Sequence, residues 1–192
     1  RYHSVYLDTA DHLLYLSHHN GLRSRYKVRF RHYLDSGLQF LEVKKKDNKD
    51  RTRKQRLTMQ EWQWPLPEAA RLFLDAHFPY EQNTLVPGME IGFSRLTLAH
   101  SVRSERLTLD LGLTFTLGER TIVQPNLVVA ELKQDRFSTQ SPFAQMLRDQ
   151  RIAPFSMSKY CMGMALLHRD LKQNNFKSRL LSLNKIANER AA

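Results

Sequence analysis

The sequence predicts an α+β fold: an antiparallel β-barrel of about eight strands with flanking helices. Three observations favour it. Charged and apolar residues alternate with the two-residue period of β-strands in segment after segment, so each strand has one charged and one apolar face. Carboxylates recur among the cations on the charged faces. Helices are predicted over 66–77, 141–150 and 158–174, where they can cover the apolar faces from outside.

The alternation is densest between Arg23 and Arg56. In RSRYKVRFRHY, cations occupy every second position of the strand, and apolar residues fill the gaps. FLEVKKK and RTRKQRLTMQ repeat the pattern in the next two strands. One such strand is more often a solvated sheet face, but cations in three successive strands repel one another and call for an anion. The charged face of the three strands carries Arg25, Lys27, Arg29, Arg31, Glu42, Lys44, Lys46, Lys54 and Arg56.

The other elements follow from period and boundaries. SVYLDT forms a short first strand, and IGFSRLTLAH, SERLTLDLG, LTFTLG and NLVVAELK form strands in the second half. Ser141 and Ser158 are expected to cap the second and third helices. We expect one tunnel-like domain over 1–174, followed by a basic tail or helix extension over 175–192.

Composition limits the class of protein. A chain of 192 residues is long enough for one substantial core. The net charge of +11 and the pI of 10.0 predict anionic partners. Cys161 is the only cysteine, which fits a reducing compartment, and we expect the cytoplasm. The chain begins without Met at strand-like residues, so we interpret it as a fragment with no targeting segment. A P-loop nucleotidase is excluded because no GxxxxGK[ST] motif is present.

A barrel interior lined with Arg and Lys requires a compact, highly charged anion, because unpaired buried charge is very costly. Triphosphate or polyphosphate meets this requirement. Glu42, Asp110 and Glu131 are candidates to hold Mg²⁺ or Mn²⁺ against the phosphates, or to pair with the cations. A nucleic-acid-binding sheet is the rival interpretation, although Tyr26 and Phe30 are predicted on the face opposite the cations.

The segments SVYLDT, RYKVRFRHY, FLEVKKK, KQR, VVAELK and SKYCMG occur in an order that resembles the VTC domain over about residues 4–165. That family is the polyphosphate-polymerase branch of the triphosphate tunnel metalloenzymes. The resemblance implies an eight-stranded antiparallel tunnel, a bound Mn²⁺ or Mg²⁺, and transfer of the ATP γ-phosphate onto a growing polyphosphate chain. ATP and polyphosphate are then the expected partners and nucleic acid is not, while a membrane-protein partner is left open.

The resemblance also implies roles for individual residues. Glu131 matches the metal-binding glutamate, and Lys159 matches a lysine near the reacting phosphate. The cations expected to bind phosphates are Lys27, Arg29, Arg31, Lys44, Lys46, Lys54, Arg56, Arg95 and Lys133.

Two departures from the family pattern keep alternatives open. The opening strand with its own Glu and Lys is absent, and Phe93 stands where relatives often carry Tyr. A triphosphatase of the same superfamily and a non-catalytic polyphosphate sensor therefore remain alternatives to the polymerase.

Overall fold

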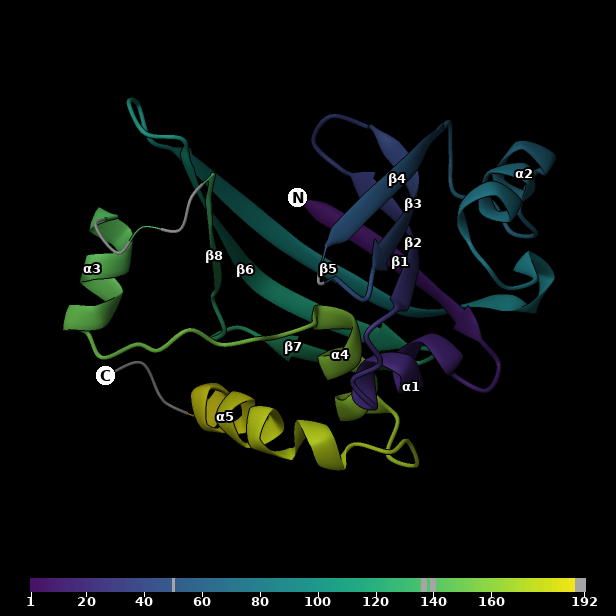
Figure 1. Cartoon of the computed structure of the whole chain (residues 1–192). Helices are drawn as coiled ribbons and strands as arrows, with labels where there is room; N and C mark the ends of the chain where they lie inside the picture. Colours follow the sequence, from purple (N-terminus) through teal and green to yellow (C-terminus); the bar gives the residue numbers. More distant parts are fainter. Residues whose placement is uncertain (50, 136–137, 139–140, 189–192) are drawn as a thin grey trace.

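The computed structural model describes residues 1–49, 51–135, 138 and 141–188 (Figure 1). Its strands are β1 (Tyr2–Thr9), β2 (Arg25–Tyr33), β3 (Gln39–Lys46), β4 (Thr52–Met59), β5 (Leu85–Ala99), β6 (Glu105–Leu117), β7 (Arg120–Gln124) and β8 (Val129–Gln134). Its α-helices are α1 (Leu13–His19), α2 (Glu68–His77), α3 (Pro142–Asp149), α4 (Lys159–Leu167) and α5 (Lys177–Asn188). Short 3₁₀ turns cover Gln82–Thr84 and Asn174–Phe176.

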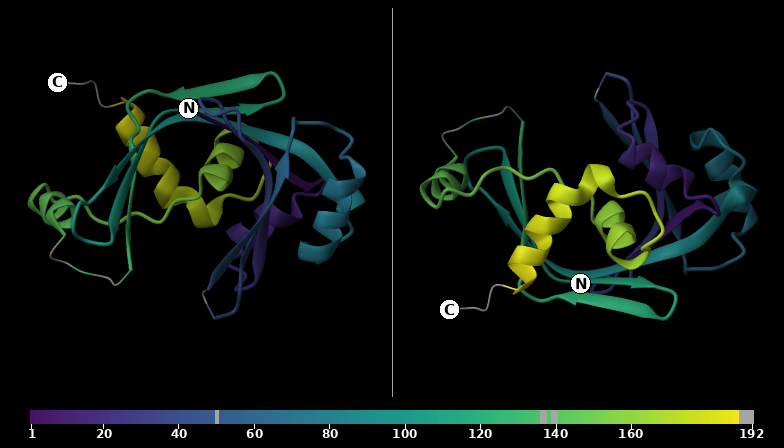
Figure 2. Two further views of the ribbon diagram at one scale, coloured as in Figure 1. Left: turned by 90° about the horizontal axis from the view of Figure 1, so that it is seen from above. Right: turned by 90° about the horizontal axis from the view of Figure 1, so that it is seen from below.

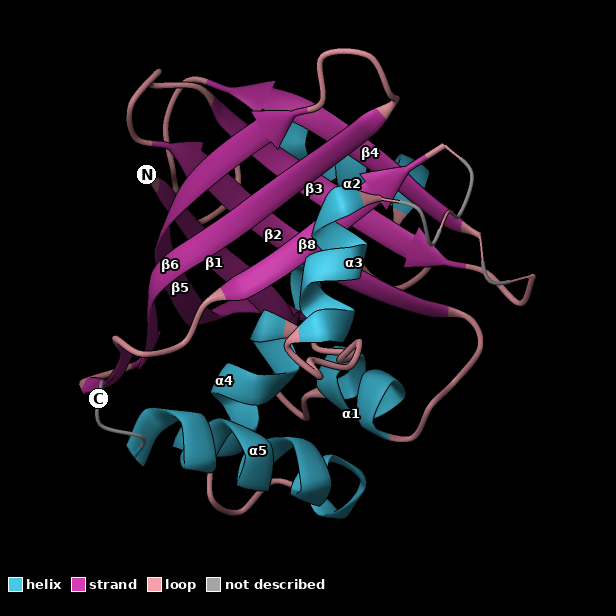
Figure 3. Ribbon diagram, turned by 90° about the vertical axis from the view of Figure 1, so that its left-hand side faces the viewer, coloured by secondary structure: helices cyan, strands magenta, loops and turns pink. Residues whose placement is uncertain are grey.

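The eight strands form one antiparallel sheet in the order β4-β3-β2-β1-β5-β6-β7, with β8 also paired to β6. The sheet is strongly curved, with α4 and α5 on its concave side and α2 outside it (Figure 2). Helices α1, α4 and α5 gather near one end of the strands (Figure 3). The predicted antiparallel strands and flanking helices are therefore confirmed. The predicted closure is not seen, because strand pairing in the described part of the chain ends at β4 on one side.

Several element boundaries differ from the prediction. The last predicted helix over 158–174 ends at Leu167, and a separate helix, α5, begins at Lys177. LTFTLG continues β6, so it is not a strand of its own. Helix α1 and strand β7 were not predicted. His12, the residue before helix α1, adopts a left-handed conformation with φ 59°, and its side chain does not cap the helix. The first amides of the helix instead donate to the side chains of Asp8 and Thr9, so the cap does not stand at the usual position next to the helix.

The apolar faces of β2 and β3 lie on the convex side, as predicted. Val28, Leu41 and Val43 are almost completely buried, and they form one cluster with Ala70 and Leu74 of α2. Because successive side chains of a strand point to opposite faces, the alternating cations of β2 and β3 lie on the concave face. Helix α2 covers this convex face with its own apolar stripe, as predicted.

Covering of the apolar faces is incomplete at the far end of β5. Leu96 and Leu98 are 54% and 57% exposed, although the sequence pattern predicts them to be packed. Helix α3, whose residues the structure describes throughout, contributes no buried residue. The expectation that all three predicted helices cover the sheet from outside is thus wrong for α3, and it is also wrong for the third helix, because α4 lies on the concave side (Figure 2).

A bulge in β6 changes which residues face inward. Gly112 has φ +60°, a conformation that favours glycine, and the register with β5 shifts between Gly92 and Ser94. Before the bulge, Asp110 is buried on the concave face; after it, Leu113 and Phe115 are buried there against α4. One extra residue therefore divides the concave side into a polar half and an apolar half.

Helix α4 fills the apolar half. Ser158 caps it by accepting a hydrogen bond from the Cys161 amide, as predicted, and seven of its nine residues are buried. Gly163 lies where a Cβ atom would come within 2.6 Å of the Phe115 ring and 3.1 Å of the Met89 sulfur. Close approach of helix and sheet therefore depends on a residue without a side chain.

We expect Gly163→Ala to lower the free energy of unfolding by about 1–3 kcal/mol, because the methyl group overpacks a closed core. This exceeds the gain of about 1 kcal/mol that alanine brings to a helix. Gly88→Ala is the matched control, since its Cβ would meet only the Tyr6 carbonyl oxygen at 3.7 Å. Urea denaturation measures both. Equal stability of Gly163→Ala and the parent would show that α4 does not pack this closely.

Candidate anion-binding site

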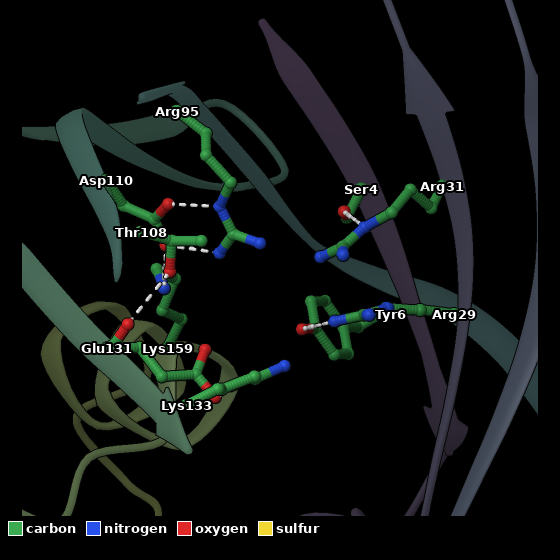
Figure 4. A network of polar contacts seen from close by, with 10 residues as sticks. All are labelled: Ser4, Tyr6, Arg29, Arg31, Arg95, Thr108, Asp110, Glu131, Lys133 and Lys159. Carbon is green, nitrogen blue, oxygen red and sulfur yellow. Dashed lines mark hydrogen bonds and ion pairs between the residues drawn. The ribbon is translucent and has the colours of Figure 1, made fainter. Parts of the chain in front are cut away.

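Two walls of polar side chains face each other across the polar half of the concave side (Figure 4). Strands β1 and β2 provide Ser4, Tyr6, Arg29 and Arg31 on one wall. The other wall consists of Arg95 from β5, Thr108 and Asp110 from β6, Glu131 and Lys133 from β8, and Lys159 from α4. Residues far apart in the sequence are thus directed at one central space.

The first wall is organised around Glu42, whose side chain is 2% exposed. Arg29 donates to Glu42 Oε2 from Nε at 2.8 Å and from Nη2 at 2.6 Å, and Lys54 forms an ion pair with the other carboxylate oxygen. Burial opposes ionisation of Glu42, but Arg29 and Lys54 outweigh it, so the pKa of this carboxyl lies below its ordinary value. Glu42 is therefore an internal ion-pair partner.

The second wall is organised in the same way around Asp110. Arg95 donates to its two carboxylate oxygens at 2.6 and 2.8 Å, and Lys159 Nζ lies 2.5 Å from Oδ2. Here too burial is outweighed by hydrogen bonds from Arg95 and Lys159, so the pKa of Asp110 is lowered. The bidentate Arg95 contact and the capped start of α4 fix both cations in place.

An aromatic pair supports the cations of both walls. The Phe93 ring stacks on the Tyr2 ring at a centroid distance of 5.1 Å. Arg95 lies over both rings, at 5.2 Å from the Tyr2 centroid and 5.4 Å from the Phe93 centroid, and Lys159 Nζ lies 5.1 Å from the Phe93 centroid. Such contacts favour a cation on the ring face. Phe93 thus positions charge without the hydroxyl that tyrosine would bring.

Two groups show that positive charge is in excess between the walls. Burial opposes ionisation of Tyr6, but Arg29, Arg31 and Lys27 outweigh it and lower the pKa of Tyr6 to about 8. Its hydroxyl oxygen accepts a hydrogen bond from Arg29 Nη1 at 2.9 Å. Burial and the charge of Arg29 lower the pKa of Arg31, whose Nε donates to Ser4 Oγ at 3.1 Å. An anion placed here relieves this repulsion.

The structure places the predicted residues in three groups. Arg29, Arg31, Arg95 and Lys159 converge on the central space, with Glu131 and Lys133 at its edge. Lys54 reaches this space only through Glu42, and Arg56 is exposed on the outermost strand β4 with its guanidinium 4.8 Å from the Phe40 centroid. The remaining cations, Lys27, Lys44 and Lys46, line a pocket near the start of β2.

Sequence reasoning missed the residues that β1 brings to the site. Tyr2, Ser4 and Tyr6 occupy alternate positions of YHSVYLDT and contact cations of the walls. Their alternation with Val5 and Leu7 is the signal that could have identified them. A run of polar and aromatic residues on one strand face is easily read as ordinary packing.

The described residues contain no group of three or more His, Cys, Asp or Glu side chains that could hold a metal ion. Glu42 and Asp110 are committed to cations, whereas the Glu131 side chain is 54% exposed, with Lys133 Nζ at 3.5 Å. One open carboxylate fits Mg²⁺ or Mn²⁺ only where phosphate oxygens and water complete the shell, a common arrangement for Mg²⁺ in proteins. The residues therefore fit a metal that arrives with a phosphate substrate.

These features place the chain among curved antiparallel sheets with a cationic interior. The chain belongs to the VTC domain family, whose model matches residues 1–168. No curated protein matches the sequence. No helix of the described residues is long and apolar enough to span a membrane.

Solved structures are similar in fold. A putative adenylyl cyclase from Hippeastrum, described as having a dominant triphosphatase activity, has a TM-score of 0.50 at 13% identity, over 85% of this chain and 81% of that chain. A putative adenylate cyclase from Bacillus halodurans has a TM-score of 0.47 at 14% identity, over 87% of this chain and 81% of that chain. At such identity the likeness concerns the fold alone.

We expect Asp110→Asn to destabilise the protein by about 3–5 kcal/mol at pH 7, because it leaves Arg95 and Lys159 without their carboxylate. The folded-state pKa of Asp110 lies below its ordinary 3.8. Its contribution is therefore fully present above that value and is lost as the pH falls through the lower folded value. The difference in free energy of unfolding between parent and variant should stay constant from neutral pH to about pH 4 and shrink below it.

Denaturant titrations at several pH values measure this difference. Asp75→Asn, on the exposed side of α2, is the control that removes a carboxylate without an ion-pair partner among the described residues. A difference that already shrinks between pH 7 and 5 would contradict the lowered pKa of Asp110.

Proposed function

We propose that this protein is a metal-dependent polyphosphate polymerase, which transfers the γ-phosphate of ATP onto a growing polyphosphate chain. The observation that carries the proposal is the central space between Arg29, Arg31, Arg95 and Lys159, where buried carboxylates offset only part of the positive charge (Figure 4). A multiply charged, compact anion suits such a space, and VTC family membership agrees with it. We further propose that it acts in the cytoplasm.

Phosphoryl transfer requires positioning and charge neutralisation from the protein more than a covalent group. Arg29 and Arg31 would bind phosphate oxygens from one wall, and Arg95 and Lys159 from the other. Because ion pairs and ring contacts fix these groups before substrate arrives, little reorganisation is needed at the moment of reaction. The two walls would hold the attacking and leaving oxygens on opposite sides of the transferred group.

Glu131 would hold Mn²⁺ or Mg²⁺ together with phosphate oxygens, as its exposure and its place at the edge of the space allow. When bound, such an ion neutralises charge on the phosphates. Lys133, which pairs with Glu131, would keep the carboxylate directed toward the substrate. The charge of Glu131 is then needed for turnover more than for folding.

Nucleic acid fits this site less well. Tyr26 and Phe30 interleave with the cations of β2 in the sequence, but Tyr26 packs beneath α2 and Phe30 lies against Trp62 on the other face. A single-stranded nucleic acid requires open aromatic rings beside the cations. The rings on the cationic face, Tyr2 and Phe93, stack on each other and lie against Arg95 and Lys159, so their faces are already occupied. We therefore propose ATP and polyphosphate as the partners.

The test is incubation of the protein with ATP and Mn²⁺ or Mg²⁺, followed by separation of the products on a gel. We expect long polyphosphate to accumulate with ADP. Release of free phosphate without polyphosphate would instead identify a triphosphatase. Binding of polyphosphate without any turnover would identify a sensor, and either outcome overturns the polymerase assignment.

We expect Glu131→Gln to reduce turnover by about a hundredfold or more, because the loss of a metal's charge stabilisation is worth several kcal/mol in the transition state. Tripolyphosphate should still bind, since the arginines remain. Glu119→Gln, an exposed glutamate in the turn after β6, is the matched control. Turnover rates and tripolyphosphate affinities of the three proteins measure the effect, and unchanged turnover in Glu131→Gln would remove the proposed ligand.

A further inference from the structure

A cavity of about 430 Å³ lies where β1 ends, at the end of the sheet near which α1 and α4 gather (Figure 3). Its lining comes from the end of β1, the start of β5, the turn between β6 and β7, and α4. None of the described residues that line it belongs to the two walls of the central space. Tyr160, Met164 and His168 follow one another at intervals of four, so one face of α4 and its C-cap is directed at this cavity.

The floor of the cavity is apolar. Met89 and Met164 line it and are almost completely buried, whereas Val86 lines it nearer the surface and is exposed. Methionine side chains are flexible and polarizable, so they adapt to apolar groups of varied shape. Gly88 adds room, because a Cβ atom there would meet only the Tyr6 carbonyl oxygen, at 3.7 Å. Such a lining is typical of cavities that bind small molecules.

Two histidines bring hydrogen-bonding capacity that the fold does not use. The rings of His12 and His168 meet edge to face at a centroid distance of 4.9 Å. Neither imidazole forms a hydrogen bond with a described residue, and His168 Nδ1 is buried without a partner. A buried polar atom in this state is uncommon and calls for an explanation. Both rings can donate from one nitrogen and accept at the other, so they can serve a polar ligand.

The charges of the lining favour an anionic group. The guanidinium of Arg120, an exposed residue at the start of β7, has no hydrogen bond, ion pair or ring contact with any described residue. Asp8 is the only carboxylate among the described lining residues, and it is buried. Its oxygens accept hydrogen bonds from three backbone amides and from the Tyr160 hydroxyl. The unpartnered charge of the cavity is therefore positive and lies at its exposed rim.

We propose that this cavity binds a small organic carboxylate with an unbranched apolar body. The carboxylate would pair with Arg120 at the rim, whose planar fork suits two carboxylate oxygens. The apolar body would lie on Met89 and Met164. One unpartnered cation matches a single negative charge, whereas a phosphate chain requires several cations. The proposal goes beyond the proposed function and does not rest on it.

Nuclear magnetic resonance of protein labelled with ¹³C at the methionine methyl groups tests the proposal, with hexanoate as the probe. The chain has six methionines, whose resonances are assigned through single Met→Leu variants. We expect hexanoate to shift the resonances of Met89 and Met164 but not those of Met59 and Met146, which do not line the cavity. Each methylene removed from the probe, down to butanoate, should weaken binding by about fourfold. Uncharged 1-hexanol should bind about tenfold more weakly than hexanoate, because it lacks the hydrogen bond between charged groups.

Two variants locate the head group and the apolar body. Arg120→Gln should weaken hexanoate binding by about tenfold and leave 1-hexanol binding unchanged. Gly88→Leu should abolish binding of both probes, because its side chain fills the cavity. Arg71→Gln is the matched control, since it removes one arginine charge from the exposed face of α2. Thermal melting checks folding, and the exposed Arg120→Gln keeps the test decisive where Gly88→Leu unfolds.

Three results overturn the proposal. One is hexanoate that leaves both cavity methyl groups unshifted, or that shifts only Met157 and Met162, which line the cationic pocket at the start of β2. Another is equal hexanoate affinity in Arg120→Gln and the parent. The third is equal affinity for hexanoate and 1-hexanol, which would show an apolar cavity that does not recognise a carboxylate. The proposed polymerase is tested separately with ATP, so its failure leaves this site in place.

Discussion

Repulsion between cations on the concave face is the constraint on which the rest of this structure depends. Glu42 and Asp110 reduce this repulsion, because each binds two cations. Taken as whole residues, both are about 1% exposed. Glu42 on β3 connects Arg29 of β2 with Lys54 of β4, and Asp110 on β6 connects β5 with α4 through Arg95 and Lys159. Such buried pairs add little net stability over apolar packing, but breaking one is costly, so they fix which elements meet. Each carboxylate also leaves net positive charge in place, and the fold therefore retains its capacity for an anion.

The positions of these cations also depend on the packing in the apolar half of the concave side. Asp8 accepts hydrogen bonds from the amides of Leu14 and Tyr15 and from the Tyr160 hydroxyl, which ties β1, α1 and α4 together. The bulge at Gly112 then turns Phe115 toward α4 and Asp110 toward the cations. Because α4 is held by packing along its length, its first residue, Lys159, enters the charged half in a fixed position. Packing at one end of the sheet thus determines the geometry of the charges at the other.

The local pattern of the sequence was sufficient to predict which faces of β2 and β3 are buried and where α3 and α4 begin. Alternation and serine caps act over only a few residues. It was insufficient where one residue changes the outcome. Gly112 in TLDLGLTF reads equally as a strand residue or a bulge, and the choice reverses the facing of everything after it. Sequence also placed Glu42 and Asp110 on the charged faces but not beside their partners, because pairing across strands is set by register. Closure of the sheet is a non-local property of the same kind, and the strand pairing of the described residues does not show it.

The pairing of the cations with carboxylates has a consequence for the proposed phosphoryl transfer. An enzyme gains rate only from interactions that strengthen in the transition state, so very tight binding of the reacting phosphates would slow turnover. In the central space, Glu42 and Asp110 already occupy hydrogen bonds of Arg29, Arg95 and Lys159, and this weakens their hold on a ground-state phosphate. Under the proposed function, this weaker hold on the ground state would favour turnover over tight binding of the reacting phosphates.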